Sequence, residues 1–490
     1  MNLYIEIDGI RVSTLHYING ERVTSSESFA NHCPTDGRLI GEVAAGLEEH
    51  CDAAIRAART AFPGWAAIGP TGRREMLLRF AKELRARGDQ LARVESEDNG
   101  MLLKRLKGHG VDRCAHNIEF FAELAVEIEH STIKGEKALH NVRHDPAGVC
   151  VLITPWNSPL MLTTWKIGPA LAAGNTVVVK PPEWAPLTCS MLGDIATAVG
   201  LPPGVFNVVQ GLGATTGARL VGDPRVNRIS FTGSVPTAKF IAKAAADNLV
   251  PVSLELGGKS PFIVLKDSDL QLAADTAALQ YRNAGQVCLA GTRILVDEAV
   301  APRFLELMRN RVESLKVGDP REDLTEVGPL IHPKQVERVA GFVDRARAAG
   351  ANVVWGGKRH DAGAQFYEPT LVSGVRQEDE IVQNEVFGPV LVLQTFRDEA
   401  EAVQLANGTR FGLAGVVFGS VERATIVANQ LRTGMVWKNS FFLRDLGAPF
   451  GGVGESGIGR EGGAWSFDFF CDVKDVMTPS QAYKPAFAGR

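Results

Sequence analysis

The chain has 490 residues, of which 45% are hydrophobic and 22% charged, and its formal net charge is −4. This composition is typical of a globular protein, and the lack of a long basic block argues against a nucleic-acid partner. The length exceeds what one hydrophobic core usually serves, so we expect two large domains, with or without a small appendage. The longest apolar runs, such as 149–153, fall far short of the roughly 20 residues of a membrane span, and the acidic N-terminus predicts no export signal.

Seven cysteines are scattered along the chain without any Cys-x-x-Cys pair, at positions 33, 51, 114, 150, 189, 288 and 471. An odd number of unclustered cysteines is typical of free thiols in a reducing compartment. We therefore expect a cytoplasmic protein without a metal site.

The first half of the chain changes from a helical to an alternating pattern. Residues 50–130 are predicted to be helical, because apolar residues between 73 and 94 recur at helical spacing. From residue 149 onward, short β-rich runs alternate with helical runs. The expected strands are 149–154, 176–179, 205–209, 228–231 and 252–256, and the expected helices are 165–173 and 187–199. This alternation predicts an α/β fold whose parallel sheet is covered by helices on both faces.

The alternation resumes after residue 288 and predicts a second α/β domain that begins near Gly257. The expected strands are 294–296, 353–355, 390–393, 414–418 and 435–437, with helices such as 300–315 and 399–406 between them. The polar stretch 130–144 has the pattern of a projecting hairpin, and the tail 471–477 that of a strand. Native proteins cover exposed edge strands, so we expect these two segments to mediate homo-oligomerisation.

Two predicted strands end in residues suited to binding a nucleotide. The segment 180–183 (Lys-Pro-Pro-Glu) supplies a carboxylate that can accept both ribose hydroxyls and would repel a 2′-phosphate. The segment 231–234 (Phe-Thr-Gly-Ser) precedes a helix, and its glycine lets a phosphate approach backbone amides. Gly211, Gly213 and Gly217 form a weaker glycine pattern. Each is also compatible with an ordinary turn, but their succession along one α/β unit favours a dinucleotide.

A thiol, a carboxylate and an amide occupy three further loops. Cys288 lies in a glycine-bracketed loop, where a thiol can attack an electrophile. Glu255 precedes two glycines and offers the separate base that a covalent thioester mechanism requires. Asn157 follows the strand at 149–154 and can present an amide to a developing oxyanion, although a plain turn asparagine is the commoner occurrence.

The order and spacing of these motifs resemble those of the aldehyde dehydrogenase superfamily over residues 20–477. The motifs that carry the resemblance are 156–157, 180–183, 231–234, 254–259, 285–288, 385–389 and 449–452. The resemblance implies a Rossmann-like NAD-binding domain, a catalytic α/β domain and a small β bridging element that builds homodimers or homotetramers. The expected limits are 1–125 and 147–256 for the first, 257–470 for the second, and 126–146 with 471–490 for the third.

The resemblance also implies NAD-dependent oxidation of an aldehyde to a carboxylic acid through a thiohemiacetal and a thioester on Cys288. Glu255 would be the base, and Asn157 would hold the oxyanion together with the backbone N–H of Cys288. Lys180 is a further catalytic candidate, and surface positions for Lys180 and Lys259 are the alternative. The implied cofactor contacts are Ile153, Thr154, Pro155, Trp156, Lys180, Pro182, Glu183, Gly213, Gly217, Phe231, Thr232, Gly233, Ser234, Glu255, Leu256, Gly257, Glu385 and Phe387.

The substrate is expected to be a carboxylated semialdehyde. The runs 164–167 and 442–446 are similar to those of the branch that oxidises hydroxymuconic and aminomuconic semialdehydes in aromatic catabolism. An arginine fork holds a carboxylate bidentately, and Arg113 and Arg444 are the candidates. Trp165 and Phe442 are the expected lining residues. The alternatives are a solvated helix face for Arg113 and a carboxylate partner, such as the neighbouring Asp445, for Arg444.

Two departures and four rival interpretations remain. Gly447 stands where that branch commonly has an arginine, and Gly454 where the family often has a lysine. A benzaldehyde-type substrate is therefore a rival. A coenzyme-A-acylating enzyme would not need Glu255, and a retired binding or structural protein would be expected to have lost at least one of the three catalytic candidates. NADP is disfavoured by Glu183.

Overall fold

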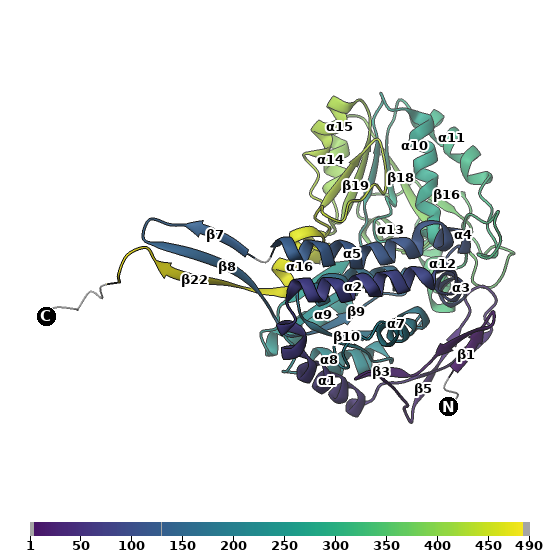
Figure 1. Ribbon diagram of the computed structural model, residues 1–490. Helices are drawn as coiled ribbons and strands as arrows, with labels where there is room; N and C mark the ends of the chain where they lie inside the picture. Colours follow the sequence, from purple (N-terminus) through teal and green to yellow (C-terminus); the bar gives the residue numbers. More distant parts are fainter. Residues whose placement is uncertain (1–3, 129, 484–490) are drawn as a thin grey trace.

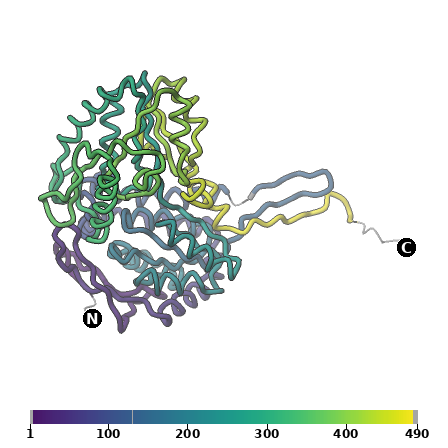
Figure 2. The backbone as a smooth tube through the Cα atoms, turned by 180° about the vertical axis from the view of Figure 1, so that it is seen from behind, coloured from purple at the N-terminus to yellow at the C-terminus, as the bar shows by residue number. Residues whose placement is uncertain are grey.

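The computed structural model describes residues 4–128 and 130–483 and contains two lobes, each built on a largely parallel sheet (Figure 1). One lobe holds an eight-stranded sheet and the other a seven-stranded sheet. A three-stranded antiparallel arm projects from the side of the molecule, as the view from behind also shows (Figure 2). The α/β fold with a small additional β element, which the sequence predicts, is confirmed.

The first sheet has the strand order β21-β13-β12-β9-β10-β11-β3-β4, and its five central strands are parallel. They are β9 (Val149–Ile153), β10 (Thr176–Lys180), β11 (Phe206–Val208), β12 (Arg228–Gly233) and β13 (Val252–Leu256). The edge strands β3 (His16–Ile18), β4 (Glu21–Val23) and β21 (Gly457–Ile458) are antiparallel to their neighbours. All five strands predicted for the first α/β unit are present.

Alternate side chains of the central strands are buried on opposite faces of this sheet. Val149 and Val151 belong to a cluster with α1 (Glu48–Ala67) and α9 (Val235–Asp247). Cys150 and Leu152 belong to another with α6 (Pro159–Ala172) and α7 (Leu187–Ala198). Because both faces are covered, the strands are continuous apolar runs. The other helices of this lobe are α2 (Gly69–Ala86), α3 (Gly88–Asn99), α4 (Leu103–Arg105), α5 (Val111–Ile128) and α8 (Ala218–Val221).

The second sheet has the order β16-β17-β18-β15-β14-β19-β20, and only β16 is antiparallel to its neighbour. Its strands are β14 (Pro261–Val264), β15 (Arg293–Asp297), β16 (Asn352–Trp355), β17 (Thr370–Ser373), β18 (Val390–Phe396), β19 (Ala414–Phe418) and β20 (Met435–Lys438). Its helices are α10 (Leu270–Ala278), α11 (Ala301–Glu313), α12 (Pro333–Ala348), α13 (Glu380–Gln383), α14 (Glu399–Asn407) and α15 (Val421–Ala428), whereas α16 (Gly463–Phe470) packs against α5 and α6 of the first lobe. The strands β14 and β17 were not predicted from the sequence, whereas β16 and β20, which have the same length, were.

The arm consists of β7 (His130–Lys134), β8 (Ala138–Pro146) and β22 (Cys471–Pro479), in the order β22-β8-β7. The predicted hairpin and the predicted C-terminal strand therefore lie side by side. Apolar side chains on the arm are exposed, among them Ile133 (58%), Val473 (60%) and Met477 (62%). Its role in assembly stays a prediction, and residues 129 and 484–490 of the expected bridging element lie outside the described residues.

The predicted domain boundary at 256/257 falls between β13 and β14, which belong to different sheets. β21 and α16 lie in the range expected for the second domain but belong to the first lobe, since β21 pairs with β13 and α16 packs against α5 and α6. Two small sheets that the sequence did not predict, β1 (Tyr4–Ile7) with β2 (Ile10–Ser13) and β5 (Ser28–His32) with β6 (Leu39–Ala44), precede α1. Within the described ranges, no helix combines the length and apolarity needed to cross a membrane.

Candidate active site

The loop that carries Cys288 is built on unusual backbone conformations. It follows a short helical segment, η3 (Leu279–Gly285), in which Asn283 and Ala284 both have φ of 51°. Gly285 continues with φ of 69°, and a Cβ there would lie 2.0 Å from the carbonyl oxygen of Gly388. Such left-handed, close-packed backbone is held only where the surrounding structure imposes it. The loop therefore presents Cys288 in a fixed position between the two lobes.

Cys288 lines two cavities at once and therefore lies where they meet. The residue is half-buried, and all seven cysteines are free thiols. Burial, assisted by the carboxylate of Glu385, raises the pKa of the Cys288 thiol to about 12. The thiol is therefore protonated at neutral pH, and its use as a nucleophile requires removal of that proton.

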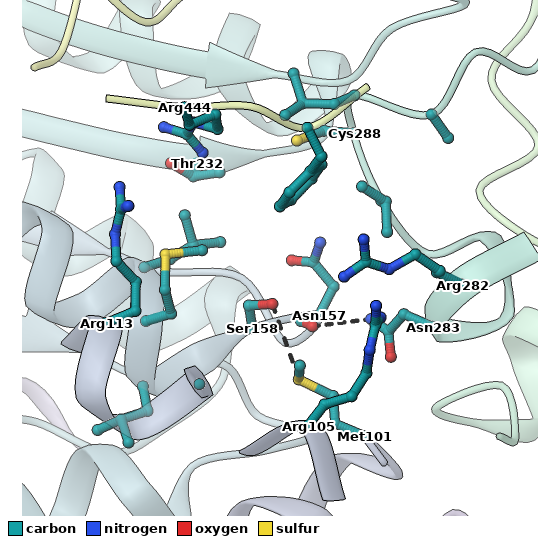
Figure 3. A pocket seen from close by; sticks show the side chains of 18 of the residues that line it. Met101, Arg105, Arg113, Asn157, Ser158, Thr232, Arg282, Asn283, Cys288 and Arg444 are labelled. Atoms are coloured by element: carbon teal, nitrogen blue, oxygen red, sulfur yellow. Dashed lines mark hydrogen bonds between the residues drawn. The ribbon is translucent and has the colours of Figure 1, made fainter. Parts of the chain in front are cut away.

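Asn157 extends from the turn after β9 into the space beside Cys288 (Figure 3). Its side-chain amide donates a hydrogen bond of 2.9 Å to the carbonyl of Gln286, and its own backbone carbonyl accepts one of 3.0 Å from Asn283. An amide group has two N–H donors, so one remains for a ligand. Within the described part of the chain, the backbone N–H of Cys288 also makes no hydrogen bond. The pair can hold a developing oxyanion.

Glu255 lies at the end of β13, opposite Thr232 of β12, and contacts both cavities. It is 3% exposed, and among the described residues neither carboxylate oxygen has a hydrogen-bond partner. Burial, with the nearby charge of Glu461, raises the pKa of Glu255 well above its usual range. Removal from water disfavours the charged form of the carboxyl group.

A buried polar network lies behind the part of the cavity wall that Glu255 forms. Glu461 accepts hydrogen bonds from Lys166 (2.7 Å), the indole N–H of Trp165 (2.6 Å) and Ser230 (3.1 Å). The Lys166–Glu461 ion pair is almost fully removed from solvent. Because each charge has its partner, the network holds the wall beside Glu255 in one arrangement.

The larger cavity, of about 570 Å³, collects part of the predicted cofactor-binding set. The members of that set on its lining are Pro155, Trp156, Thr232, Gly233, Ser234, Glu255, Leu256, Gly257, Glu385 and Phe387. Ser234 is the N-cap of the 13-residue helix α9, whose N-terminus faces this cavity. Phe387, with φ of 58°, packs edge-on against Trp156 at a centroid distance of 5.3 Å.

Glu385 is held tightly at the floor of this cavity. It accepts a hydrogen bond of 3.1 Å from the N–H of Gly258, and a Cβ on Gly257 would lie 2.0 Å from its carboxylate. Burial raises the pKa of Glu385 to about 7. Lys259 is 1% exposed, and burial lowers its pKa to about 7, so the alternative of a surface lysine is wrong.

The remaining predicted cofactor residues do not line the cavity. Lys180, 2% exposed and therefore not a surface residue, forms an ion pair of 2.9 Å with Glu183 at the end of β10. Burial alone would raise the pKa of Glu183, but Lys180 outweighs it and the pKa is lowered. The others are Ile153, Thr154, Pro182 and Phe231, which are buried at or beside the strand ends, and Gly213 and Gly217, which lie in the π-helical turn η2 (Gly213–Gly217). A Cβ at either of these glycines would meet no atom within 4 Å.

The smaller cavity, of about 200 Å³, is lined by four arginines, namely Arg105, Arg113, Arg282 and Arg444. In the part of the chain that the structure describes, none of them has a carboxylate within ion-pair distance. The predicted partner of Arg444, a neighbouring carboxylate, is therefore not found. Arg113 faces the cavity and not solvent alone, and it donates a hydrogen bond of 3.1 Å to Asn117.

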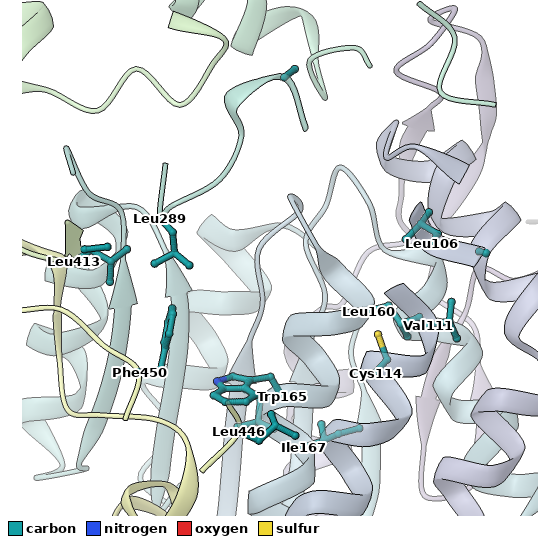
Figure 4. Packing of buried hydrophobic residues seen from close by; sticks show 14 of the residues in the cluster. Leu106, Val111, Cys114, Leu160, Trp165, Ile167, Leu289, Leu413, Leu446 and Phe450 are labelled. Atoms are coloured by element: carbon teal, nitrogen blue, oxygen red, sulfur yellow. The ribbon is translucent and has the colours of Figure 1, made fainter. Parts of the chain in front are cut away.

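Sequence reasoning found Arg113 and Arg444 but missed Arg105 and Arg282. Arg282 stands beside the Cys288 loop and could have been found by asking which charges flank that loop. Arg105 ends the three-residue helix α4, which has no pattern to read. Phe442 lines the cavity as expected, whereas Trp165 does not. Trp165 is 3% exposed and lies behind the wall, among the buried side chains around Phe450 (Figure 4).

Two α/β lobes with a thiol, an amide and a carboxylate converging between them define a two-lobed protein with a cysteine-centred site. The sequence profile of the aldehyde dehydrogenase family matches residues 22–476. The 2-hydroxymuconic semialdehyde dehydrogenase of Pseudomonas sp. strain CF600 is 40% identical over 478 residues, which cover 94% of this chain and 98% of that protein. The chain therefore belongs to the aldehyde dehydrogenase family and is an oxidoreductase.

Solved structures give the same result. HpcC of Thermus thermophilus is 41% identical, with a TM-score of 0.94 over 97% of this chain and 95% of that chain. The betaine aldehyde dehydrogenase of Staphylococcus aureus, crystallised in complex with NAD⁺, is 36% identical, with a TM-score of 0.94 over 98% of this chain and 97% of that chain. The relatives named after 2-hydroxymuconic semialdehyde and betaine aldehyde are similarly identical to this chain, so family membership alone does not fix the aldehyde.

Proposed function

We propose that this protein is an NAD-dependent, non-acylating dehydrogenase that oxidises a carboxylated semialdehyde of hydroxymuconate type to the acid. The observation that carries the substrate class is the pair Arg113 and Arg444, which line the cavity shared with Cys288 without a carboxylate partner among the described residues. Guanidinium groups so placed bind a carboxylate bidentately. The likeness to a 2-hydroxymuconic semialdehyde dehydrogenase supports the same class.

The larger cavity fits a dinucleotide. The N-terminus of α9 at Ser234 offers backbone N–H groups and the positive end of a helix dipole to a pyrophosphate. Thr232 Oγ1 is buried without a hydrogen-bond partner among the described residues, and Glu385 offers a carboxylate to a ribose. Glu183 would hold the second ribose and disfavour NADP. NAD⁺, when bound, accepts the hydride that leaves the aldehyde carbon, and a relative has been crystallised with it.

The first half of the reaction uses the thiol and the amide. The Cys288 thiol loses its proton to water, and the thiolate sulfur bonds to the aldehyde carbon while the C=O π electrons move to the oxygen. The free N–H of Asn157 and the backbone N–H of Cys288 hold that oxyanion. Loss of one such donor typically costs about 10²–10³ in rate. Departure of a hydride from the carbon restores the C=O bond and leaves a thioester on Cys288.

The second half uses the carboxylate. Glu255 removes a proton from water, the resulting hydroxide adds to the thioester carbon, and the C–S bond breaks to release the carboxylic acid and the Cys288 thiolate. A raised pKa suits a base that must both take and release a proton near neutral pH. The sum is aldehyde, NAD⁺ and water giving carboxylate, NADH and two protons.

The test is NADH formation, followed by absorbance, with aldehydes that do and do not carry a carboxylate. We expect 2-hydroxymuconic semialdehyde and succinic semialdehyde to exceed hexanal and benzaldehyde in kcat/KM, and Arg113→Gln or Arg444→Gln to remove this preference. A preference for benzaldehyde that ignores both arginines would replace the semialdehyde by a neutral aromatic aldehyde. No turnover with any aldehyde would favour a retired scaffold.

The arm is proposed to build a homodimer or homotetramer, because its exposed apolar side chains leave an uncovered edge. Deleting the exposed apolar groups together, by Ile133→Ser and Val473→Ser, should shift the protein to a smaller species in light scattering. The cytoplasmic location expected from the cysteine pattern stays a prediction.

A further inference from the structure

The small cavity contains a second pair of arginines that the proposed reaction does not yet use. Arg105 lies at the end of α4 and Arg282 in η3, directly before Asn283. Figure 3 shows Arg105 and Arg282 on one side of Asn157 and Arg113 and Arg444 on the other. The two arginines of each pair come from different elements, so neither pair results from the spacing of residues along one helix.

The members of each pair lie close enough to repel one another. Burial, together with the charge of Arg105, lowers the pKa of Arg282 to about 10. Burial, together with the charge of Arg113, lowers the pKa of Arg444 to about 10. Two guanidinium groups are held together in this way at a cost in electrostatic energy, and an anion placed between them removes that cost.

One arginine of each pair packs against an aromatic ring. The guanidinium of Arg282 lies 5.1 Å from the ring centroid of Phe442, which itself adopts φ of 66°. On the other side, the guanidinium of Arg444 lies 4.1 Å from the ring centroid of Phe450. Aromatic rings attract a cation without neutralising it, so both arginines remain available to an anion.

Carboxylates in the same cavity do not balance these charges. Glu95 accepts hydrogen bonds from Thr188 and from the N–H of Leu160, and burial raises its pKa to about 7. Burial raises the pKa of Glu255 well above its usual range and so disfavours its charged form, and Glu461 is already paired with Lys166. Four positive charges therefore face a space without free negative charge among the described residues.

We propose that the substrate carries two anionic groups besides the aldehyde, one bound by Arg113 with Arg444 and the other by Arg105 with Arg282. The inference rests on the proposed function and narrows it to dicarboxylated semialdehydes. One carboxylate cannot satisfy two guanidinium pairs that lie on opposite sides of Asn157, whereas a branched or long dianion can. The product then carries three carboxylates, and the pocket must release it after hydrolysis.

The kinetic test compares 3-carboxymethyl-6-oxohexanoate, 6-oxohexanoate and hexanal, which share one carbon chain and carry two, one and no carboxylates. We expect kcat/KM to fall in that order, by about tenfold or more at each step. Arg105→Gln and Arg282→Gln should each lower kcat/KM for the dianion by about 10- to 100-fold, mostly through KM, and lower it for the monoanion far less. Arg282→Lys keeps the charge but loses the fork, so its kcat/KM for the dianion should lie between those of the wild type and of Arg282→Gln.

A matched control is Arg309→Gln. Arg309 also lies over an aromatic ring, that of Trp355 at 5.2 Å, but does not line the cavity. This variant should leave the order of the three aldehydes unchanged. Equal losses for all three aldehydes in Arg105→Gln and Arg282→Gln would indicate a general effect on the fold and overturn the proposal.

A binding measurement separates this inference from turnover. In calorimetry without cofactor, butane-1,2,4-tricarboxylate should bind more tightly than adipate, and Arg282→Gln should abolish the difference. If the monoanion is preferred over hexanal but the dianion gains nothing, the second site is wrong and the proposed function stands. If hexanal is preferred and no arginine matters, the proposed function itself fails.

Discussion

The two cavities that meet at Cys288 treat charge in opposite ways. In the larger one, Glu385 is bound by the N–H of Gly258, and Glu183 nearby is paired with Lys180. In the smaller one, four arginines lack carboxylate partners within the described residues. Charges with partners fix the shape of a site, whereas charges without partners are available to a ligand. The larger cavity is therefore built to position its ligand, and the smaller cavity to select among ligands.

The largest expected effect lies at the point the cavities share. Cys288→Ala should lower turnover by at least about 10⁴-fold, because no other thiol of the chain replaces the covalent step. NAD⁺ binding, measured by calorimetry, should remain. Cys51→Ala, a buried thiol in α1, serves as the control and should keep activity. Turnover near the wild-type rate would exclude Cys288 as the nucleophile.

Glu255→Gln should slow the second half of the reaction by about 10²–10⁴-fold. NADH should then form in a burst of about one equivalent per site, followed by slow turnover in stopped-flow absorbance. Because burial raises the pKa of Glu255, wild-type turnover should rise as the pH increases through that raised value, and the variant should lack this rise. Glu326→Gln, which breaks a surface pair with Arg311, is the control. A variant without a burst contradicts the role in hydrolysis.

Glu183→Ser should narrow the preference for NAD over NADP by roughly tenfold, since it removes a carboxylate that repels a 2′-phosphate and frees Lys180 to bind one. The ratio of kcat/KM for the two cofactors measures the effect. An unchanged ratio would contradict the ribose assignment and show that the Lys180–Glu183 pair does not select the cofactor.

Glu95→Gln tests a carboxylate on the wall of the smaller cavity and has the smallest expected effect. Folding raises the pKa of Glu95 from 4.5 to about 7. Its neutral form is therefore favoured in the folded state, and this stability is present below pH 4.5 and lost as the pH rises through 7. The loss amounts to at most about 3 kcal/mol. The urea midpoint of the wild type should fall more between about pH 5 and pH 8 than that of the variant, and equal falls would contradict the shift.

The larger cavity could be predicted from the sequence and the smaller one only in part. Carboxyl ends of parallel strands meet at one edge, so Thr232, Ser234 and Glu255 could be grouped as soon as β12 and β13 were recognised. Arg105 and Arg282 come from short, irregular segments whose relative positions no periodicity determines. These contacts depend on tertiary packing.

Trp165 shows a second limit. Residues 163–172 of α6 are buried on every side, so the helix has no exposed face from which to infer direction. The indole was expected in the cavity but donates its N–H to Glu461 behind the wall. A helix buried all round hides the orientation of each side chain from any prediction based on sequence alone.

The late position of β21 in the chain has a consequence for how the protein is made. Gly457 pairs with Glu255, and Glu461 supplies the only carboxylate within ion-pair distance of Lys166 among the described residues. A ribosome therefore completes the first sheet only after nearly the whole chain has emerged, although most of that sheet is synthesised by residue 256. Until then Lys166 lacks its counter-charge, and the nascent first lobe stays an incomplete, aggregation-prone intermediate. Chains truncated by a nonsense mutation before residue 457 should accordingly be degraded by proteases and not accumulate as partly folded protein.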